Sequence, residues 1–180
     1  MNKVHTSACV IIPPKELWDP IQTIRQIYDR HIHRWMPHIT LLYPFRSKAE
    51  FDDLEKSFIK KCSEIHSFEI ILRKLRYFRH RHQNYTIWLD PEPTNSITQL
   101  QAELLKIVPD CDDVNKYKNG FTPHLSVGQV KGKEKLDHII ETLQNSWKDL
   151  RFLLNSVYFI SRENNKFSRF EIIKEVLLKV

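Results

Sequence analysis

The sequence predicts an α+β fold made of two pseudo-symmetric β-α-β-α-β lobes, whose antiparallel-rich sheets form a central cleft. Segments with strand and helix patterns alternate in the same order in both halves of the 180-residue chain. A four-residue phrase is nearly repeated, as PHIT at 37–40 and PHLS at 123–126, on the middle strand of each half. Composition alone gives about 0.008 such matches by chance, so the repetition indicates two related sites.

The first half opens with a strand and an amphipathic helix. A strand over 4–12 ends at two consecutive prolines. Asp19 followed by Pro20 is typical of an N-cap with proline at the first helical position. The apolar face expected for this helix carries Ile21, Ile24, Ile27 and Tyr28.

Two further strands and a helix complete the first half. The strand-like segment HITLLYPF covers 38–45 and contains the first phrase. Ser47 and Glu50 then form a capping box, which predicts the start of a second helix. FEIILRKLRYF, over 68–78, reads as the third strand.

The second half repeats this order of elements. We expect strands over 85–90 and 122–129, helices over 95–108 and 136–147, and two final strands over 151–162 and 167–180 joined by a turn at Asn164-Asn165. The chain should therefore form a single two-lobed domain over 1–180, with the first lobe over about 1–82 and the second over about 83–180.

Composition excludes several classes of protein. The hydrophobic content of 41% indicates a globular chain, and no apolar run approaches the length of about 18 residues that crosses a bilayer. No signal-peptide pattern precedes the first strand. Cys9, Cys62 and Cys111 are widely spaced, which predicts reduced thiols. We therefore expect a soluble, monomeric protein of the cytoplasm or nucleus with no membrane partner.

The positive charge of the chain is concentrated in one segment. The formal net charge is +6, and the segment RKLRYFRHRH over 73–82 carries four Arg and one Lys with no acid. Tyr77 and Phe78 lie among these cations, as in surfaces that bind phosphates and stack bases. The alternative is a solvated strand end whose charges have no specific partner.

The repeated phrase places an imidazole and a hydroxyl on one side of each strand. Side chains alternate along a strand, so His38 and Thr40 share a face, as do His124 and Ser126. Across a cleft, a neutral imidazole can accept a proton from the attacking oxygen of a phosphodiester while a protonated one supplies the leaving oxygen. The hydroxyls can hold the non-bridging oxygens. This scheme needs no metal and no cofactor, and it does not assign which histidine is the acid.

The phrases PHITLLYPF and FTPHLSVGQ resemble the paired H-x-[ST] motifs of the 2H phosphoesterase superfamily, which includes 2′-5′ RNA ligase-like proteins and cyclic nucleotide phosphodiesterases. The resemblance covers nearly the whole chain. It implies that His38 and His124 are the catalytic acid and base and that Thr40 and Ser126 bind the phosphate. It also implies an RNA end or nucleotide as partner, with a 2′,3′-cyclic phosphate or a 2′-5′ linkage as the reacting group.

Two positions near the second motif extend the resemblance. Phe121 lies where many members have an aromatic residue that borders the cleft. Gln129 stands where many members carry Arg or Lys, so it is at most a neutral substitute. Phosphate affinity would then depend on Arg46, just past the first motif, or on the cluster over 73–81.

Aromatic residues near the motifs are candidates for stacking a nucleobase. Tyr43, Phe45 and Phe121 are the three, and such a contact contributes about 1–3 kcal/mol. By strand parity Tyr43 shares a face with Ile39 and Leu41, which favours a core position unless Pro44 breaks the alternation.

Three other functions compete with this interpretation. Two HxH pairs can chelate zinc on a strand, but arginines flank them and no nearby Cys or carboxylate completes a set: His31 with His33, and His80 with His82. A binding-only module would recognise nucleotide ends in the same cleft without turnover, although the two His and two hydroxyls argue against lost catalysis. A structural interaction domain rests only on Trp18 and Trp35.

Overall fold

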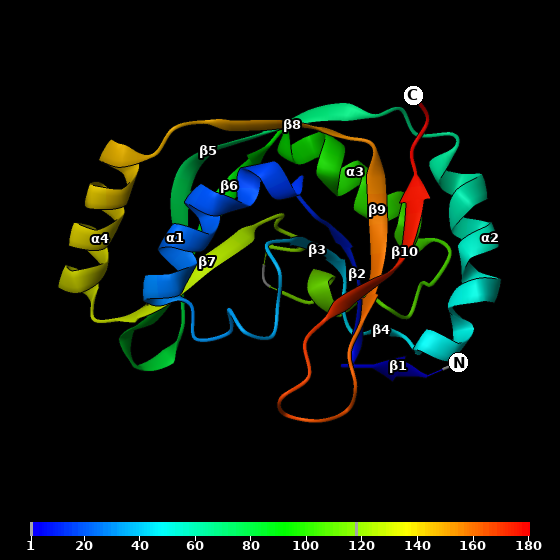
Figure 1. The fold of residues 1–180 in the computed structure, drawn as a ribbon, viewed down its shortest axis with the longest axis horizontal. Helices are drawn as coiled ribbons and strands as arrows, with labels where there is room; N and C mark the ends of the chain where they lie inside the picture. Colours follow the sequence, from blue (N-terminus) through cyan, green and yellow to red (C-terminus); the bar gives the residue numbers. More distant parts are fainter. Residues whose placement is uncertain (1, 118) are drawn as a thin grey trace.

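The computed structural model describes residues 2–117 and 119–180, and it has the predicted α+β architecture (Figure 1). Two four-stranded antiparallel sheets form its centre, with strand orders β10-β9-β2-β3 and β7-β6-β5-β8. The first sheet contains β2 (Ser7–Ile11), β3 (Ile39–Leu42), β9 (Ser156–Ser161) and β10 (Glu171–Leu177). The second contains β5 (Phe68–Arg79), β6 (Asn84–Glu92), β7 (Leu125–Lys131) and β8 (Leu150–Leu154).

The remaining elements surround these sheets. β1 and β4 pair as a short ribbon, and four helices pack on the sheets, α2 beside β10 and α1 and α4 against β7. Their bounds are β1 (Lys3–Val4), β4 (Phe45–Arg46), α1 (Trp18–Tyr28), α2 (Phe51–Cys62), α3 (Thr94–Leu105) and α4 (Lys133–Ser146). Short 3-10 turns cover η1 (Lys15–Leu17), η2 (Lys48–Glu50), η3 (Arg81–Gln83) and η4 (Asp113–Asn115).

The order of elements suggested a division of the chain at residue 82, but the two sheets do not follow this division. β5 comes from the first half but pairs with β6 and β8, while β9 comes from the second half and pairs with β2. The segment over 151–162, expected as one strand, breaks at Asn155 into β8 and β9, one in each sheet. The two sheets are therefore tied together by exchanged strands, and they share one core.

The buried face of helix α1 differs from the predicted apolar face at one position. Ile21 and Ile24 are buried as expected, but Ile27 is 69% exposed, and Arg25 is only 2% exposed in its place. The helix also begins at Trp18, before Pro20, because the η1 turn leads directly into it. The capping box of Ser47 and Glu50 is confirmed, at the η2 turn that leads into α2.

α1 approaches β7 so closely that only glycine fits at the crossing. A Cβ at Gly128 would lie 2.4 Å from the Tyr28 Cβ, well inside contact distance. The absence of a side chain at Gly128 thus brings the end of α1, from the first half of the chain, onto the strand that carries the second motif.

The main hydrophobic core contains buried residues from both sheets and all four helices. Its centre is an aromatic cluster of Phe45, Phe51, Phe58 and Phe159. The three cysteines lie in this core as free thiols, and burial raises the pKa of Cys62 and Cys111 to about 11. Among the described residues, no helix has the length and hydropathy of a membrane span.

Candidate active site

The two motifs lie on strands that pack beside one another. His38 directly precedes β3 and His124 directly precedes β7, and these strands come from different sheets. Each histidine is half-buried, whereas Ile39 and Leu125, the next residues, are fully buried. The alternation expected from strand geometry therefore holds in both motifs.

A β-bulge follows each motif at the same position. In β3 the register moves from Thr40 opposite Val10 to Leu42 opposite Cys9, which leaves Leu41 unpaired. In β7 it moves from Ser126 opposite Trp88 to Gly128 opposite Ile87, so the extra residue there is the third after His124. Bulges commonly re-aim side chains next to active sites. The matching bulges extend the internal symmetry beyond what the sequence displays.

Each imidazole is held by the backbone carbonyl two residues earlier. The His38 Nδ1 donates to the Met36 oxygen at 2.7 Å, and the His124 Nδ1 donates to the Thr122 oxygen at 2.8 Å. Because a carbonyl can only accept, Nδ1 carries the proton in both rings. Each Nε2 of the neutral ring is then an acceptor, and within the described chain neither makes a hydrogen bond.

Both histidines are poised in the neutral form. Burial lowers the pKa of His38 to about 4, and the positive charges of Arg25 and of a protonated His124 act in the same direction against the Met36 hydrogen bond. Burial also lowers the pKa of His124 from its usual 6.5.

Aromatic rings fix the orientation of each imidazole. Trp35 stacks on His38 with ring centroids 4.7 Å apart, and Phe170 stacks on Trp35 at 3.8 Å. His124 meets the edge of Phe78 at 4.9 Å and of Trp88 at 6.0 Å. Trp35, which the interaction-domain hypothesis cited, therefore supports His38 instead.

The two motif hydroxyls complete the site. Thr40 and Ser126 are half-buried, and Ser126 pairs across the sheet with Trp88, which contacts His124. No described residue hydrogen-bonds to either side-chain hydroxyl. Two imidazole Nε2 atoms and two hydroxyls thus have no hydrogen-bond partner among the described residues, and groups of these kinds can move protons and bind anionic oxygens.

Tyr43 lies on the His38 side of the sheet, contrary to its strand parity. The bulge at Leu41 reverses the alternation, so Tyr43 packs its ring edge on Trp35 at 5.6 Å. Its hydroxyl donates to the His5 carbonyl at 3.2 Å. The bulge supplies the break in parity that Pro44 was expected to provide.

Phe45 and Arg46 are not positioned to bind substrate, which corrects two predictions. Phe45 is fully buried in the aromatic cluster and cannot stack on a base. Arg46 is buried, and its guanidinium forms a two-pronged ion pair with Asp110. Phe121 packs half-buried against the main core, and its role at the cleft stays a prediction.

Gln129 connects β7 to the loop after α1 and does not reach out toward a ligand. Its Oε1 accepts the Arg30 backbone N–H at 3.2 Å, and its Nε2 donates to the Asp29 Oδ1 at 3.3 Å. Asp29 in turn pairs with the buried Arg25, which also donates to the Trp35 carbonyl at 2.9 Å. This network, which positions the Trp35 loop, was missed from the sequence; its only local signal is the i,i+4 spacing of Arg25 and Asp29.

The HxH histidines do not assemble a metal site. Within the described part of the chain, no group of three or more His, Cys, Asp or Glu is arranged to hold a metal ion. His80 donates to or accepts from Thr86 at 2.9 Å, and His31 accepts from Arg30 at 3.2 Å. The four histidines are therefore not arranged to bind one metal ion together.

Comparison with known protein families assigns the chain to one of them. A model of the 2′-5′ RNA ligase superfamily matches residues 13–166, which include both motifs. The chain belongs to this superfamily. The resemblance to 2H phosphoesterases is confirmed, and the chain has a phosphoesterase-like architecture.

Members of the 2′-5′ RNA ligase superfamily and related proteins are similar over most of the chain. A Bacillus licheniformis protein named "putative phosphoesterase" is 26% identical over 136 residues, which are 75% of this chain and 77% of that protein. A Geobacillus kaustophilus protein of the same designation is 29% identical over 130 residues, 71% of this chain and 72% of its own.

Solved structures share the fold at low identity. TT0787 of Thermus thermophilus superposes with a TM-score of 0.65 at 15% identity, covering 97% of this chain and 98% of its own. Escherichia coli LigT, solved with 3′-AMP, gives a TM-score of 0.60 at 13% identity over 99% and 100% of the two chains. LigT has also been solved with ATP, with a TM-score of 0.61, 14% identity and coverage of 98% and 99%.

Proposed function

We propose that this protein is a metal-independent phosphodiesterase that acts on RNA or nucleotide 2′,3′-cyclic phosphates or on 2′-5′ linkages by two-histidine acid/base catalysis. One observation carries the proposal: on two neighbouring strands of one superfamily member, the Nε2 atoms of His38 and His124 and the hydroxyls of Thr40 and Ser126 have no hydrogen-bond partner among the described residues. The nucleotides bound to LigT support a nucleotide as ligand.

The chemistry follows from the roles of these four groups. One neutral imidazole accepts the proton of the attacking water as its oxygen bonds to phosphorus. The other, protonated, donates a proton to the ribose oxygen as the P–O bond breaks. Thr40 and Ser126 donate to the non-bridging oxygens and stabilise the charge that builds there. The histidines end with exchanged protons, and solvent restores them.

The environments of the two histidines favour one assignment for hydrolysis. The pKa of His38 is lowered to about 4 by burial and by Arg25, so His38 is the histidine that stays neutral over the wider pH range. We therefore assign His38 as the base and His124 as the acid. All four groups come from one chain, so a monomer is sufficient, and the buried free thiols suit a reducing compartment such as the cytoplasm.

Turnover of defined substrates tests the proposal. We expect the wild-type protein, in EDTA, to open a short RNA ending in a 2′,3′-cyclic phosphate or to cleave 2′-5′-linked oligoadenylate. Loss of activity in EDTA with recovery on adding zinc would contradict the metal-independent mechanism. Nucleotide binding without turnover of either substrate would instead establish a binding module that uses the same cleft.

The pH profile of kcat/KM should be bell-shaped and centred on the acidic side of neutrality. In the free enzyme the base must be neutral and the acid protonated, and the pKa of both histidines is lowered, that of His38 to about 4. The midpoint of the decline of kcat/KM on the basic side should therefore lie below pH 6.5. A bound phosphodiester anion favours the protonated acid, so the kcat profile should lie at higher pH. A kcat/KM that keeps rising above pH 7 would contradict this assignment.

A further inference from the structure

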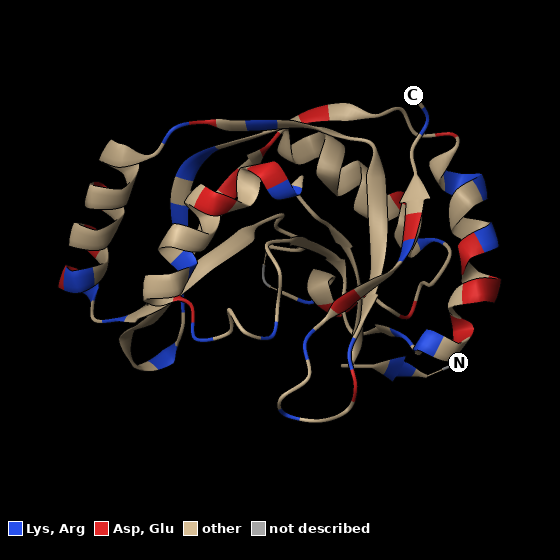
Figure 2. Ribbon diagram, viewed as in Figure 1, with Lys and Arg blue, Asp and Glu red and all other residues tan. Residues whose placement is uncertain are grey.

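The basic segment over 73–82 divides into a neutralised part and an unpaired part. Arg73 forms ion pairs with Asp149 and Glu92, and Arg76 forms one with Asp90. Among the described residues, no carboxylate forms an ion pair with Arg79 or Arg81. These two arginines lie at the tip of the β5–β6 hairpin, where Figure 2 shows positive charge with no acid beside it.

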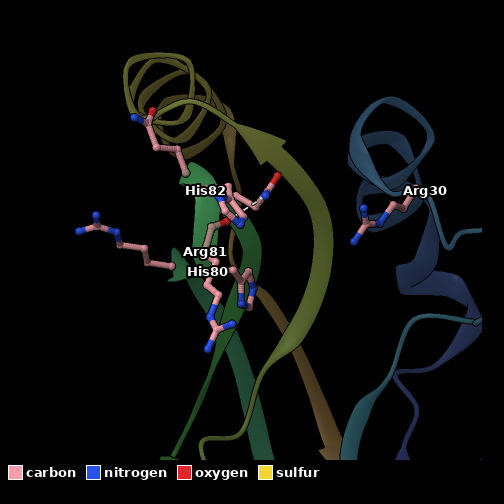
Figure 3. Close-up of a pocket in the computed structure, with 7 residues that line it drawn as sticks. Arg30, His80, Arg81 and His82 are labelled. Atoms are coloured by element: carbon pink, nitrogen blue, oxygen red, sulfur yellow. Dashed lines mark hydrogen bonds between the residues drawn. The ribbon is translucent and has the colours of Figure 1, made fainter.

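The hairpin tip forms one wall of a large pocket. The pocket has a volume of about 910 Å³ and is lined by residues 79–84 and by Arg30, which follows α1. Figure 3 shows the Arg30 side chain directed toward the tip, where His80, Arg81 and His82 lie. Like Arg79 and Arg81, Arg30 has no carboxylate partner in the described chain. Arg79 also borders a second pocket with Tyr77, Tyr85 and Lys133 on the other face of the hairpin. The guanidinium groups of Arg30 and Arg81 thus share this opening with no carboxylate among the residues that line it.

The tip is held in a backbone conformation that has an energetic cost. His82 and Gln83 both have positive φ, 56° and 55°, although neither is glycine. The Gln83 carbonyl accepts from the Gly132 N–H at 2.9 Å, and the Asn84 amide donates to the Arg81 carbonyl at 3.0 Å. Such conformations are unfavourable for residues other than glycine and are concentrated at ligand-binding segments.

One face of the second sheet connects this pocket to the active site. Ser126 pairs with Trp88, and two positions farther along β6, Thr86 pairs with Gln129. Phe78 stacks on Trp88 at 4.8 Å, and Thr86 hydrogen-bonds to His80, which lines the pocket. From Trp88 to Asn84 the strand advances about 13 Å. A nucleic-acid strand with stacked bases advances about 3.4 Å per nucleotide, so the path along β6 is longer than one nucleotide.

An unpaired donor lies at the start of this path. The Trp88 side chain is 5% exposed, and its Nε1–H has no hydrogen-bond partner among the described residues. A buried donor without an acceptor destabilises the folded protein, because it loses its hydrogen bond to water.

Arg34 and Arg162, on the side of Trp35 and Phe170, also form no ion pair with a carboxylate among the described residues, and the buried Arg162 Nε–H has no hydrogen-bond partner there. Arg162 donates to carbonyls and a hydroxyl of its own loop, over 163–168, and Arg34 donates to the Lys166 carbonyl at 3.3 Å. These arginines hold the loop beside Phe170.

We propose that the pocket of Arg30 and Arg81 binds backbone phosphates of a single-stranded RNA whose reacting end lies between His38 and His124. Phe78 and Trp88 would line the path of the intervening nucleotides. This inference rests on the proposed phosphodiesterase function and narrows its substrate to the ends of oligonucleotides, in preference to small cyclic nucleotides.

Two RNAs with the same terminal nucleotide and 2′,3′-cyclic phosphate, a mononucleotide and a hexamer, provide the kinetic test. We expect the wild-type KM for the hexamer to be at least tenfold lower. Arg30→Ala and Arg81→Ala should each remove most of that difference, and Arg81→Lys should restore part of it. Lys60→Ala, which removes an exposed cation on α2, is the matched control and should leave the ratio of the KM values unchanged.

A binding measurement separates this inference from the proposed function. A labelled hexamer with a 3′-phosphate is titrated by fluorescence anisotropy at several salt concentrations, and each arginine variant should reduce the slope of log Kd against log salt by about one. Equal KM values for mononucleotide and hexamer, or unchanged slopes in both variants, would overturn the pocket assignment even if turnover is observed. If no RNA is turned over, the proposed function fails, and the salt slopes alone decide whether the pocket binds RNA.

Discussion

Replacing His38 or His124 with glutamine should lower kcat by about 10²–10⁴-fold in either variant, because each removes one of the two proton-transfer groups. The double variant should lose little more than the worse single variant, since acid and base act in one transition state. Single-turnover assays on a cyclic-phosphate RNA measure this loss. His138→Gln, at an exposed position on α4, is the control and should retain full activity.

The leaving group distinguishes the acid from the base. A substrate that releases p-nitrophenolate needs no proton on its leaving oxygen, so its turnover should survive His124→Gln far better than His38→Gln. The opposite order would reverse the assignment of His38 as base. Equal, small losses in both variants, in protein that is folded by circular dichroism, would show that neither imidazole takes part in proton transfer.

Removing the motif hydroxyls is the second large expected effect. Thr40→Val and Ser126→Ala should each lower kcat by about 10–10³-fold, because each loses a donor to the oxygens that gain charge in the transition state. The pH at which kcat/KM is maximal should stay the same, since both imidazoles remain. Inorganic phosphate should also inhibit these variants more weakly than the wild type.

The surface hydroxyl of Thr23 provides a matched comparison for these variants. It lies on the exposed side of α1 and bonds only to the helix carbonyl of Asp19, so Thr23→Val should leave turnover unchanged. Full activity in the Thr40 and Ser126 variants would show that the hydroxyls do not bind the reacting phosphate. A shifted pH profile would show instead that they act on the histidines.

Local pattern predicted which residues of the two motifs share a face, because that depends on strand geometry. The period of two along a strand places His38 with Thr40 and His124 with Ser126, and burial of Ile39 and Leu125 anchors that orientation. The same local signals predicted the capping box and the final strand, β10. Each of these features depends on residues only a few positions apart.

The positions of the residues that we predicted to bind substrate depended on contacts that sequence spacing does not reveal. Arg46 is paired with Asp110, and Gln129 is bonded to Arg30 and Asp29, all through residues distant in the chain. Phe45 is an aromatic residue of the kind that stacks on bases, but its side chain is fully buried in the core. Tyr43 reached the site through a bulge, which no pattern of alternating residues predicts.

Short-range periodicity was thus enough to establish the two H-x-[ST] motifs, their shared faces and the α+β class. Long-range packing, in contrast, places β8 and β9 in different sheets and brings Arg30 to Arg79 and Arg81 around one pocket. It also neutralises Arg73 with Asp149. The reason is physical: charge pairing and sheet membership depend on distances in space between segments that are far apart along the chain.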